Sequence, residues 1–244
     1  MGSDARILIF APMPSEIRPV VKLLGLKKTA APGPLPVYEG RCGDTDVVLT
    51  GTGIGPALAT AAAERMIGTD STYDRVVVCG IAGGLETVSP VGDLVVPAEV
   101  YDGATGERFK ATPVDGVVPE GVIRMSDGDD YEFDDAKCAE LVAEGVTALD
   151  METAAVARVC ERVGVPWIAF RVISDMAGTN SMPPEVLELV DDYGRPKAWA
   201  SIKYLVTHPK QVPFMLKVGK DSAAAATKAA KATADGLGLA PASR

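Results

Sequence analysis

Short apolar runs recur along the chain, and most of them contain no alternating polar residues. Each run is rich in β-branched residues and ends near a glycine or a proline, which is typical of β-strands. Strands that are apolar throughout usually lie in the middle of a sheet, with both faces covered. The pattern therefore predicts central strands at residues 6–10, 46–50, 75–79, 92–96 and 167–172.

Helix-like stretches separate these runs, at residues 16–24, 56–66, 135–143 and 152–163. Strands and helices alternate along the chain, so we expect an α/β fold built on a mixed sheet. The chain contains neither an internal repeat nor an obvious domain linker. We therefore expect a single domain over residues 1–237, followed by a flexible tail at residues 238–244.

A basic segment begins at about residue 195. Residues 195–231 contain eight lysines and arginines but only one acid, Asp221, and apolar residues lie between the basic ones. This pattern predicts two amphipathic helices, broken near Pro209 and Pro213, that pack on the sheet or on a partner subunit with their lysines in solvent. A membrane-surface or lid role is the alternative. An alanine-rich helix is expected at residues 223–237.

The overall composition excludes several classes of protein. Apolar residues make up 47% of the chain and charged residues 23%, which is ordinary for a globular protein and excludes a disordered chain. The net charge of −9 argues against a nucleic-acid binder, because contact with phosphates requires positive charge. No apolar run approaches the ~20 residues needed to span a bilayer. We expect a cytoplasmic protein that binds neither nucleic acid nor membrane.

Cysteine and histidine usage narrows the chemistry further. The four cysteines are widely spaced, which favours reduced thiols over a disulfide framework or a metal site. The single histidine, His208, has no nucleophile motif near it. A site with several histidine ligands is impossible, and we expect no metal and no cofactor. Catalysis then has to use carboxylates, lysines or backbone dipoles.

Two glycine clusters follow expected strands. The first is residues 51–55 (GTGIG), which precede a helix, and the second is residues 80–84 (GIAGG), which begin with Gly80 and Ile81. Glycines after strands allow sharp turns and a close approach of the backbone to a ligand. Neither cluster matches a dinucleotide-binding or Walker motif, and tight turns without a ligand explain them about as well.

Carboxylates lie at the ends of three expected elements. Glu16 follows the first strand, Asp150 and Glu152 precede a helix, and Ser174 and Asp175 end the last strand. Ligands of open α/β sheets bind at the carboxyl ends of the strands. Asp150 and Ser174 are expected in capping or turn roles. Several acids at comparable sheet ends favour general acid–base chemistry over nucleophilic or metal catalysis.

These residues occur within motifs that resemble the nucleoside phosphorylase superfamily, most closely its methylthioadenosine/adenosylhomocysteine nucleosidases. The motifs are residues 7–17 (ILIFAPMPSEI), 53–55 (GIG), 80–85 (GIAGGL), 150–155 (DMETAA) and 171–175 (RVISD). The resemblance covers roughly residues 6–180. It implies a three-layer α/β sandwich with a twisted, barrel-like mixed sheet, a homodimer, and cleavage of the N-glycosidic bond of a purine nucleoside.

The resemblance also implies a role for each matching residue. Glu16 falls on the carboxylate that activates water, and Asp175, beside Ser174, on the acid that protonates the purine at N7. Glu152 falls on the carboxylate that holds the ribose hydroxyls, and Met151 on the residue that packs against the sugar. Cleaving this bond builds an oxocarbenium-like sugar and negative charge on the base, so one acid and one base are what the reaction needs. The second glycine cluster, with Gly80 and Ile81, is expected to contact the substrate.

The sequence departs from the family pattern at several positions. Ile81 stands where phosphorolytic members often have serine, and no arginine is apparent near the first glycine turn, so hydrolysis is favoured over phosphorolysis. Residues 127–133, rich in acids, replace the aromatic that stacks on adenine in the nucleosidases. The basic extension is loosely similar to a branch associated with hopanoid lipids. Three functions stay open: a purine nucleosidase, a phosphorylase of a hopanoid-linked nucleoside, and a non-catalytic nucleoside-binding protein.

Overall fold

A computed structural model describes most of the chain. The described residues are 5–31, 33–69, 71–85, 88–126, 134–178, 189–197, 199, 203–204 and 207–240.

The described residues form a mixed sheet of eleven strands. The strands are β1 (Ala5–Phe10), β2 (Lys27–Lys28), β3 (Tyr38–Cys42), β4 (Thr45–Thr50), β5 (Arg75–Gly84), β6 (Leu94–Val95), β7 (Glu99–Asp102), β8 (Arg108–Lys110), β9 (Val122–Met125), β10 (Val146–Asp150) and β11 (Trp167–Met176). Their order is β2-β3-β4-β1-β5-β10-β9-β7-β8, and β11 pairs with both β5 and β6. The pairs β1–β4, β1–β5 and β5–β11 are parallel, so the centre of the sheet has the topology of an α/β protein.

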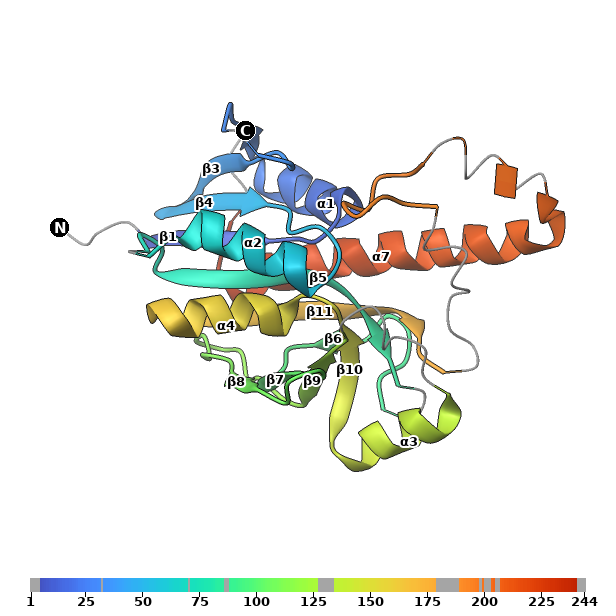
Figure 1. The fold of residues 1–244 in the computed structure, drawn as a ribbon. Coiled ribbons are helices and arrows are strands. Elements are labelled where there is room, and N and C mark those ends of the chain that lie inside the picture. Colours follow the sequence, from blue (N-terminus) through green and yellow to red (C-terminus); the bar gives the residue numbers. More distant parts are fainter. Residues whose placement is uncertain are drawn as a thin grey trace.

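Helices cover both faces of this sheet (Figure 1). They are α1 (Pro14–Leu24), α2 (Pro56–Ile67), α3 (Asp135–Ala143), α4 (Thr153–Val163), the short 3-10 helix η1 (Pro209–Gln211) and α7 (Val212–Gly236). Prolines occupy the first turns of α1 and α2, where no N–H partner is needed. Gly25 and Gly164 end α1 and α4 in the left-handed conformation that favours glycine. These local signals fix where each helix begins and ends.

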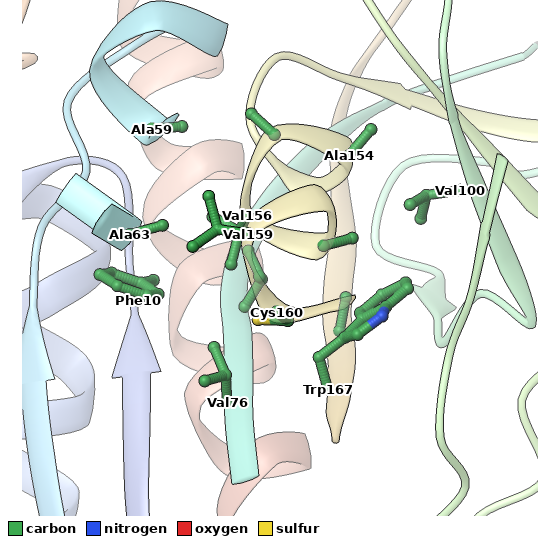
Figure 2. Close-up of a cluster of buried hydrophobic side chains, with 14 of the residues drawn as sticks. Phe10, Ala59, Ala63, Val76, Val100, Ala154, Val156, Val159, Cys160 and Trp167 are labelled. Carbon is green, nitrogen blue, oxygen red and sulfur yellow. The ribbon is translucent and has the colours of Figure 1, made fainter. Parts of the chain in front are cut away.

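Two buried clusters make the structure three-layered. One cluster packs α2 and α4 on one face of the sheet and includes Phe10, Val159 and Trp167 (Figure 2). The other packs α1 and α7 on the opposite face and includes Leu24, Phe170 and Ala229. Apolar burial of this extent provides the main driving force for folding. The core therefore holds the central strands rigidly from both sides.

The sheet opens into a fork along one edge of β5. β1 pairs with β5 as far as Val78, whereas β10 pairs with it at Gly83 and Gly84. Between these two pairings that edge of β5 has no partner among the described strands, while β11 pairs along β5 from Val76 to Gly84. Such points, where neighbouring strands diverge, form crevices in α/β sheets. The fork leaves the backbone of Ile81 free to bond to other groups.

The expected α/β class and mixed sheet are confirmed, and each of the expected strands and helices before residue 195 has a counterpart. The strand expected at residues 92–96 is shorter, because only Leu94 and Val95 pair with β11. Six further strands were not expected: β2, β3, β7, β8, β9 and β10. They are short, and β3 alternates exposed and half-buried residues rather than forming an apolar run.

The expected break near Pro209 is confirmed, because residues 203, 204 and 207 are helical and the chain leaves the helix at His208, before η1. The expected break near Pro213 is wrong. Pro213 lies in the first turn of α7, where proline is compatible with a helix, so a single helix continues to Gly236. Its buried residues all lie in the second half, which packs on the sheet, and the first half extends past the sheet (Figure 1). Packing continues beyond this helix to Leu239, which is buried.

The basic segment packs on the protein only in part. The described lysines between residues 199 and 220 are exposed, as expected. Phe214 and Met215 are half-buried, but Trp199 and Leu216 are 80% and 70% exposed. The expected packing on the sheet is therefore wrong for these two side chains, and packing on a partner subunit stays a prediction. Within the described part of the chain, no helix combines the length and apolar character needed to cross a membrane.

Candidate active site

Glu16 lies at the fork of the sheet. The chain leaves β1, turns at Pro12 and Met13, and enters α1, which places Glu16 in the first turn of the helix. The carboxylate is 1% exposed, and its Oε1 accepts a hydrogen bond of 2.8 Å from the N–H of Ile81. Its Oε2 accepts a second bond, also 2.8 Å, from the N–H of Met13. Glu16 thus takes the place of a strand partner on the open edge of β5.

A buried arginine connects Glu16 to the start of α4. Arg171 lies on β11 and is completely buried. Its Nη2 is 2.8 Å from Asp150 Oδ2 and 3.2 Å from Glu152 Oε2, and its Nη1 is 4.0 Å from Glu16 Oε1. Nη1 also donates to the carbonyl of Ile81 over 3.2 Å. One guanidinium therefore joins three carboxylates that come from distant parts of the sequence.

The turn between β10 and α4 holds two of these carboxylates. Asp150 accepts bonds of 3.3 Å from the N–H groups of Glu152 and Thr153, which confirms the turn role that was one of the two roles expected for it. Thr153 donates its hydroxyl to Asp150 and accepts from Arg171 over 2.9 Å. Glu152 Oε1 accepts from the N–H of Gly55 over 3.1 Å, so the first glycine turn also reaches this cluster.

Burial shapes the protonation of this cluster. Desolvation raises the pKa of Glu16 to about 7, although Arg171 and the two N–H donors oppose the rise. Desolvation likewise raises the pKa of Glu152 to about 7, again against the attraction of Arg171. Three carboxylates around one guanidinium carry an excess of negative charge, which also favours holding a proton. Glu16 and Glu152 can therefore gain or lose protons near neutral pH.

Ser174 and Asp175 form a second acidic group on β11. The register with β5 shifts between Ile173 and Asp175, so that Asp175 lies opposite Gly83. Bulges of this kind re-aim side chains and are frequent at functional sites. Ser174 Oγ lies 2.5 Å from Asp175 Oδ1, to which it donates. Burial raises the pKa of Asp175, against this hydrogen bond.

Gly80 makes room for the cluster. A Cβ at this position would lie 2.1 Å from Glu16 Oε1 and 2.8 Å from Arg171 Nη1. Any side chain would therefore displace the carboxylate or the guanidinium. Close approach, rather than an unusual backbone angle, is the reason for glycine here.

The structure brings together most of the residues that the sequence singled out. Gly80, Ile81, Glu16 and Glu152 share the Arg171 cluster, and Ser174 and Asp175 lie further along β11. Met151 is half-buried and adjoins Glu152. Residues 127–133, expected to replace the stacking aromatic, lie outside the described residues. Among those described, no group of three or more His, Cys, Asp or Glu is positioned to hold a metal ion.

Sequence reasoning assigned no role to Arg171 or to the N–H groups of Met13 and Gly55. A signal for Arg171 was present, because it is a lone charge inside the apolar strand at residues 167–173. A charged side chain in a central strand has to be paired to be buried. No comparable sequence signal exists for backbone donors.

Comparison with known proteins establishes the family. The model of the phosphorylase superfamily matches residues 6–128 and 114–198. The chain belongs to this superfamily. Among similar curated proteins is the 5′-methylthioadenosine/S-adenosylhomocysteine nucleosidase of an Exiguobacterium species. It is 30% identical to the present chain over 175 residues, which cover 57% of the present chain and 72% of the relative. The nucleosidase of the same name from Glaesserella parasuis is 25% identical over 203 residues, covering 72% and 88%.

Solved structures confirm the expected fold of this superfamily member. The futalosine hydrolase of Helicobacter pylori matches with a TM-score of 0.71 and 20% identity, over 96% of this chain and 98% of that one. The methylthioadenosine nucleosidase of Neisseria meningitidis, in complex with methylthio-immucillin-A, matches with a TM-score of 0.70 and 21% identity, over 95% and 98%. The fold of the present chain therefore matches the folds of these two enzymes over nearly the whole length of each chain.

Proposed function

We propose that the chain is a nucleosidase that hydrolyses the N-glycosidic bond of a 5′-modified adenosine, such as methylthioadenosine or adenosylhomocysteine. The observation that carries the proposal is the buried carboxylate of Glu16, held at the fork of the sheet with a pKa of about 7. The names of the curated relatives support the same class of reaction and substrate. The substrate is a small molecule.

Departure of the base requires an acid. When the bond between C1′ of the sugar and the base nitrogen breaks, its electron pair goes to the base. Asp175 supplies the proton that neutralises the base at N7, and its raised pKa keeps that proton available. Ser174 donates to Asp175 Oδ1, which leaves Oδ2 to carry the proton toward the base.

Attack on the sugar requires a base. A water molecule forms the new bond to C1′, and its proton passes to the carboxylate of Glu16. A base with a pKa near 7 is well matched to neutral pH, because it is partly ionised and still strong enough to take a proton. The bonds from Ile81 and Met13 fix its orientation. The products are the free base and a ribose that keeps its 5′ substituent.

Glu152 and Met151 bind the sugar in this proposal. A carboxylate facing vicinal hydroxyls can accept two charge-assisted hydrogen bonds, which position the ribose for attack. Glu152 is held by Gly55 and Arg171, so its direction is set before the substrate binds. Met151 packs against the sugar. Gly80 and Ile81 form the floor beneath the attacked carbon.

The geometry supports hydrolysis rather than phosphorolysis. A bound phosphate needs positive charge and free N–H donors. At this site three carboxylates outnumber the single positive charge of Arg171, and the N–H groups of Ile81 and Gly55 already bond to Glu16 and Glu152. A phosphate dianion placed here would be repelled by those carboxylates. Water carries no such penalty.

The protein works in this proposal as a cytoplasmic homodimer of single-domain subunits, without membrane contact and without a cofactor. The net charge of −9 supports the absence of membrane contact, because it opposes binding to an anionic bilayer. The basic extension that begins near residue 195 belongs to the same domain, since the second half of α7 packs on β11 and α1.

The deciding experiment measures release of adenine from methylthioadenosine and from adenosylhomocysteine, with and without inorganic phosphate. We expect equal rates in both buffers, and a free 5′-substituted ribose as the second product. A rate that depends on phosphate, with a ribose 1-phosphate as product, would establish a phosphorylase. Tight binding of methylthioadenosine without release of adenine would instead establish a non-catalytic binding protein.

A further inference from the structure

A compact turn lies between β11 and α7, at Asp191–Arg195. Val190 and Pro196 form an isolated bridge, and the N–H of Asp191 donates to the carbonyl of Arg195 over 2.9 Å. The Asp191 carboxylate accepts from the N–H groups of Tyr193 and Arg195, over 3.0 and 2.8 Å. These bonds hold the turn in one conformation by local interactions alone.

The turn contacts the first glycine cluster. The N–H of Ile54 donates to the carbonyl of Asp192 over 2.8 Å. A Cβ on Gly53 would lie 3.1 Å from that same carbonyl oxygen and 3.2 Å from the Tyr193 ring. The backbone of the glycine cluster and the Asp191–Arg195 turn are therefore in direct contact.

The turn also contacts the segment that precedes α1. A Cβ on Gly194 would lie 2.4 Å from Cγ of Met13 and 2.9 Å from its Cβ and Sδ, so the backbone of Gly194 rests on that side chain. The Arg195 guanidinium donates to the carbonyl of Pro34 over 2.6 Å and lies 5.1 Å from the centre of the Tyr193 ring. Arg195 thus fastens the turn to the body of the protein.

Both contacted segments hold a carboxylate of the candidate site. The N–H of Met13 donates to Glu16 over 2.8 Å, and the N–H of Gly55 donates to Glu152 over 3.1 Å. The two segments bond to each other as well, from the N–H of Gly53 to the carbonyl of Pro12 over 3.1 Å. The turn lies against this pair of segments without touching either carboxylate through any described bond.

We propose that the Asp191–Arg195 turn is a positioning clamp that holds Glu16 and Glu152 in their working orientation, with Gly194 and Arg195 as its positioning residues. The proposal deepens the nucleosidase function and rests on it for its effect on turnover. Misplacement of a reacting group by about 1 Å can cost ~10²-fold in rate. Displacing the clamp at Met13, which bonds to Glu16 and not to Glu152, should therefore lower kcat far more than it changes KM.

The clamp also affects protonation. The N–H of Met13 favours the ionised form of Glu16, so weakening that bond should raise the pKa of the carboxylate further. The other groups that face Glu16 are Arg171 on β11, Glu152 before α4, and Cys79 on β5, a thiol whose pKa burial raises to about 12, so that it is neutral. None of these lies in the clamp.

The test compares Gly194→Ala with Gly43→Ala. Both glycines have a positive φ, +68° and +60°, but a Cβ on Gly43 meets no atom within 4 Å. The two variants share the backbone strain, and only Gly194→Ala pushes on Met13. The first readout is a substrate-free titration of the Glu16 carboxyl by ¹³C NMR, assigned with Glu16→Gln. The second is the pH profile of kcat for adenine release.

We expect Gly194→Ala to move the Glu16 titration to higher pH and to lower kcat by ~10²-fold near neutral pH, with partial recovery in alkaline buffer. Gly43→Ala should match the parent in both. An unchanged Glu16 titration in folded Gly194→Ala would overturn the clamp. If Gly194→Ala does not fold, Arg195→Ala, which removes the bond to Pro34 without adding bulk, decides by the same readouts. A parent protein that releases no base would refute the nucleosidase function, and the titration would still decide on the clamp.

Discussion

Arg171 and Asp150 form a buried ion pair, with 2.8 Å between Nη2 of the guanidinium and Oδ2 of the carboxylate. The two residues come from β11 and from the end of β10, strands that pair along opposite edges of β5. Their attraction connects the strands on the two sides of β5, next to the point where Glu16 enters the fork. It also allows a full positive charge to exist inside the apolar run at residues 167–173.

Removing this arginine should destabilise the protein strongly. Arg171→Met leaves Asp150 and Glu152 buried without their counterion, and breaking a buried pair typically costs about 3–5 kcal/mol. Arg162→Met is the matched control, because Arg162 pairs with Glu64 at the surface, where an ion pair contributes about 0–1 kcal/mol. Urea unfolding at pH 7 measures both. An equal decrease in the free energy of unfolding of the two variants would contradict the role given to Arg171.

Glu16 should make stability depend on pH in a characteristic direction. Its pKa rises from the ordinary 4.5 to about 7 in the folded protein, so the folded state binds more protons than the unfolded state between these values. The contribution to stability is complete below the unfolded pKa and is lost as the pH rises through about 7. Glu16→Gln cannot lose a proton. As the pH rises from 5 to 8, the free energy of unfolding of Glu16→Gln should therefore increase relative to that of the parent, by at most ~3 kcal/mol.

Chemical denaturation at several pH values measures this difference. Glu161→Gln, which changes an exposed glutamate of α4, is the control and should stay parallel to the parent. A difference between Glu16→Gln and the parent that does not change with pH would show that Glu16 is ionised across the whole range.

The sequence predicts the centre of this fold much better than its edges. β1, β4, β5 and β11 are buried on both faces, and their apolar runs are visible without any structure. β7, β9 and β10 lie in the arm of the sheet beyond β5, and each is at most five residues long. Strands this short owe their existence to their partners, because β-propensity depends on neighbours more than on the residues themselves.

The sequence likewise predicts some features of the candidate site and not others. Glu16, Glu152 and Asp175 were predictable, because each acid lies beside a recognisable strand or helix end. The pairing of Glu16 with Arg171 was not, because no local pattern links residues so far apart in sequence. Pro213 shows the converse error: a residue that breaks most helices is compatible with the first turn of one, and only the register of α7 reveals its position.

Asp175→Asn should keep the fold and lose most of the turnover. The amide cannot donate an acidic proton to the departing base, and general acid catalysis is typically worth ~10²–10⁴-fold in rate. Ser174→Ala removes only a hydrogen-bond partner of that carboxyl, so we expect a smaller loss. Steady-state release of adenine from methylthioadenosine, together with thermal unfolding of each variant, measures both effects. Turnover of Asp175→Asn within a factor of two of the parent would remove Asp175 from the mechanism.

Glu152 should discriminate between ribose and deoxyribose. A carboxylate that holds both vicinal hydroxyls loses one charge-assisted bond when the 2′-hydroxyl is missing, which costs roughly 1.5–3 kcal/mol. We therefore expect kcat/KM for 5′-methylthio-2′-deoxyadenosine to be ~10-fold or more below that for methylthioadenosine. Glu152→Gln should narrow this gap. Equal rates for the two nucleosides with the parent enzyme would leave Glu152 with only its bonds to Gly55 and Arg171.

Gly80 should tolerate no side chain, whereas Gly83, three residues along the same strand, should accept one. A Cβ on Gly80 would lie 2.1 Å from Glu16 Oε1, but a Cβ on Gly83 meets no atom closer than 3.8 Å. Gly80→Ala must therefore push Glu16 away from Ile81, and displacement of a catalytic base should lower kcat by ~10²-fold. Gly83→Ala changes a glycine of the same strand, and its free energy of unfolding should lie within about 1 kcal/mol of that of the parent. The two variants are compared by adenine release and by urea unfolding. Full activity in Gly80→Ala would mean that the Glu16 carboxylate can do its work from another position, and the bond to Ile81 would lose its place in the mechanism.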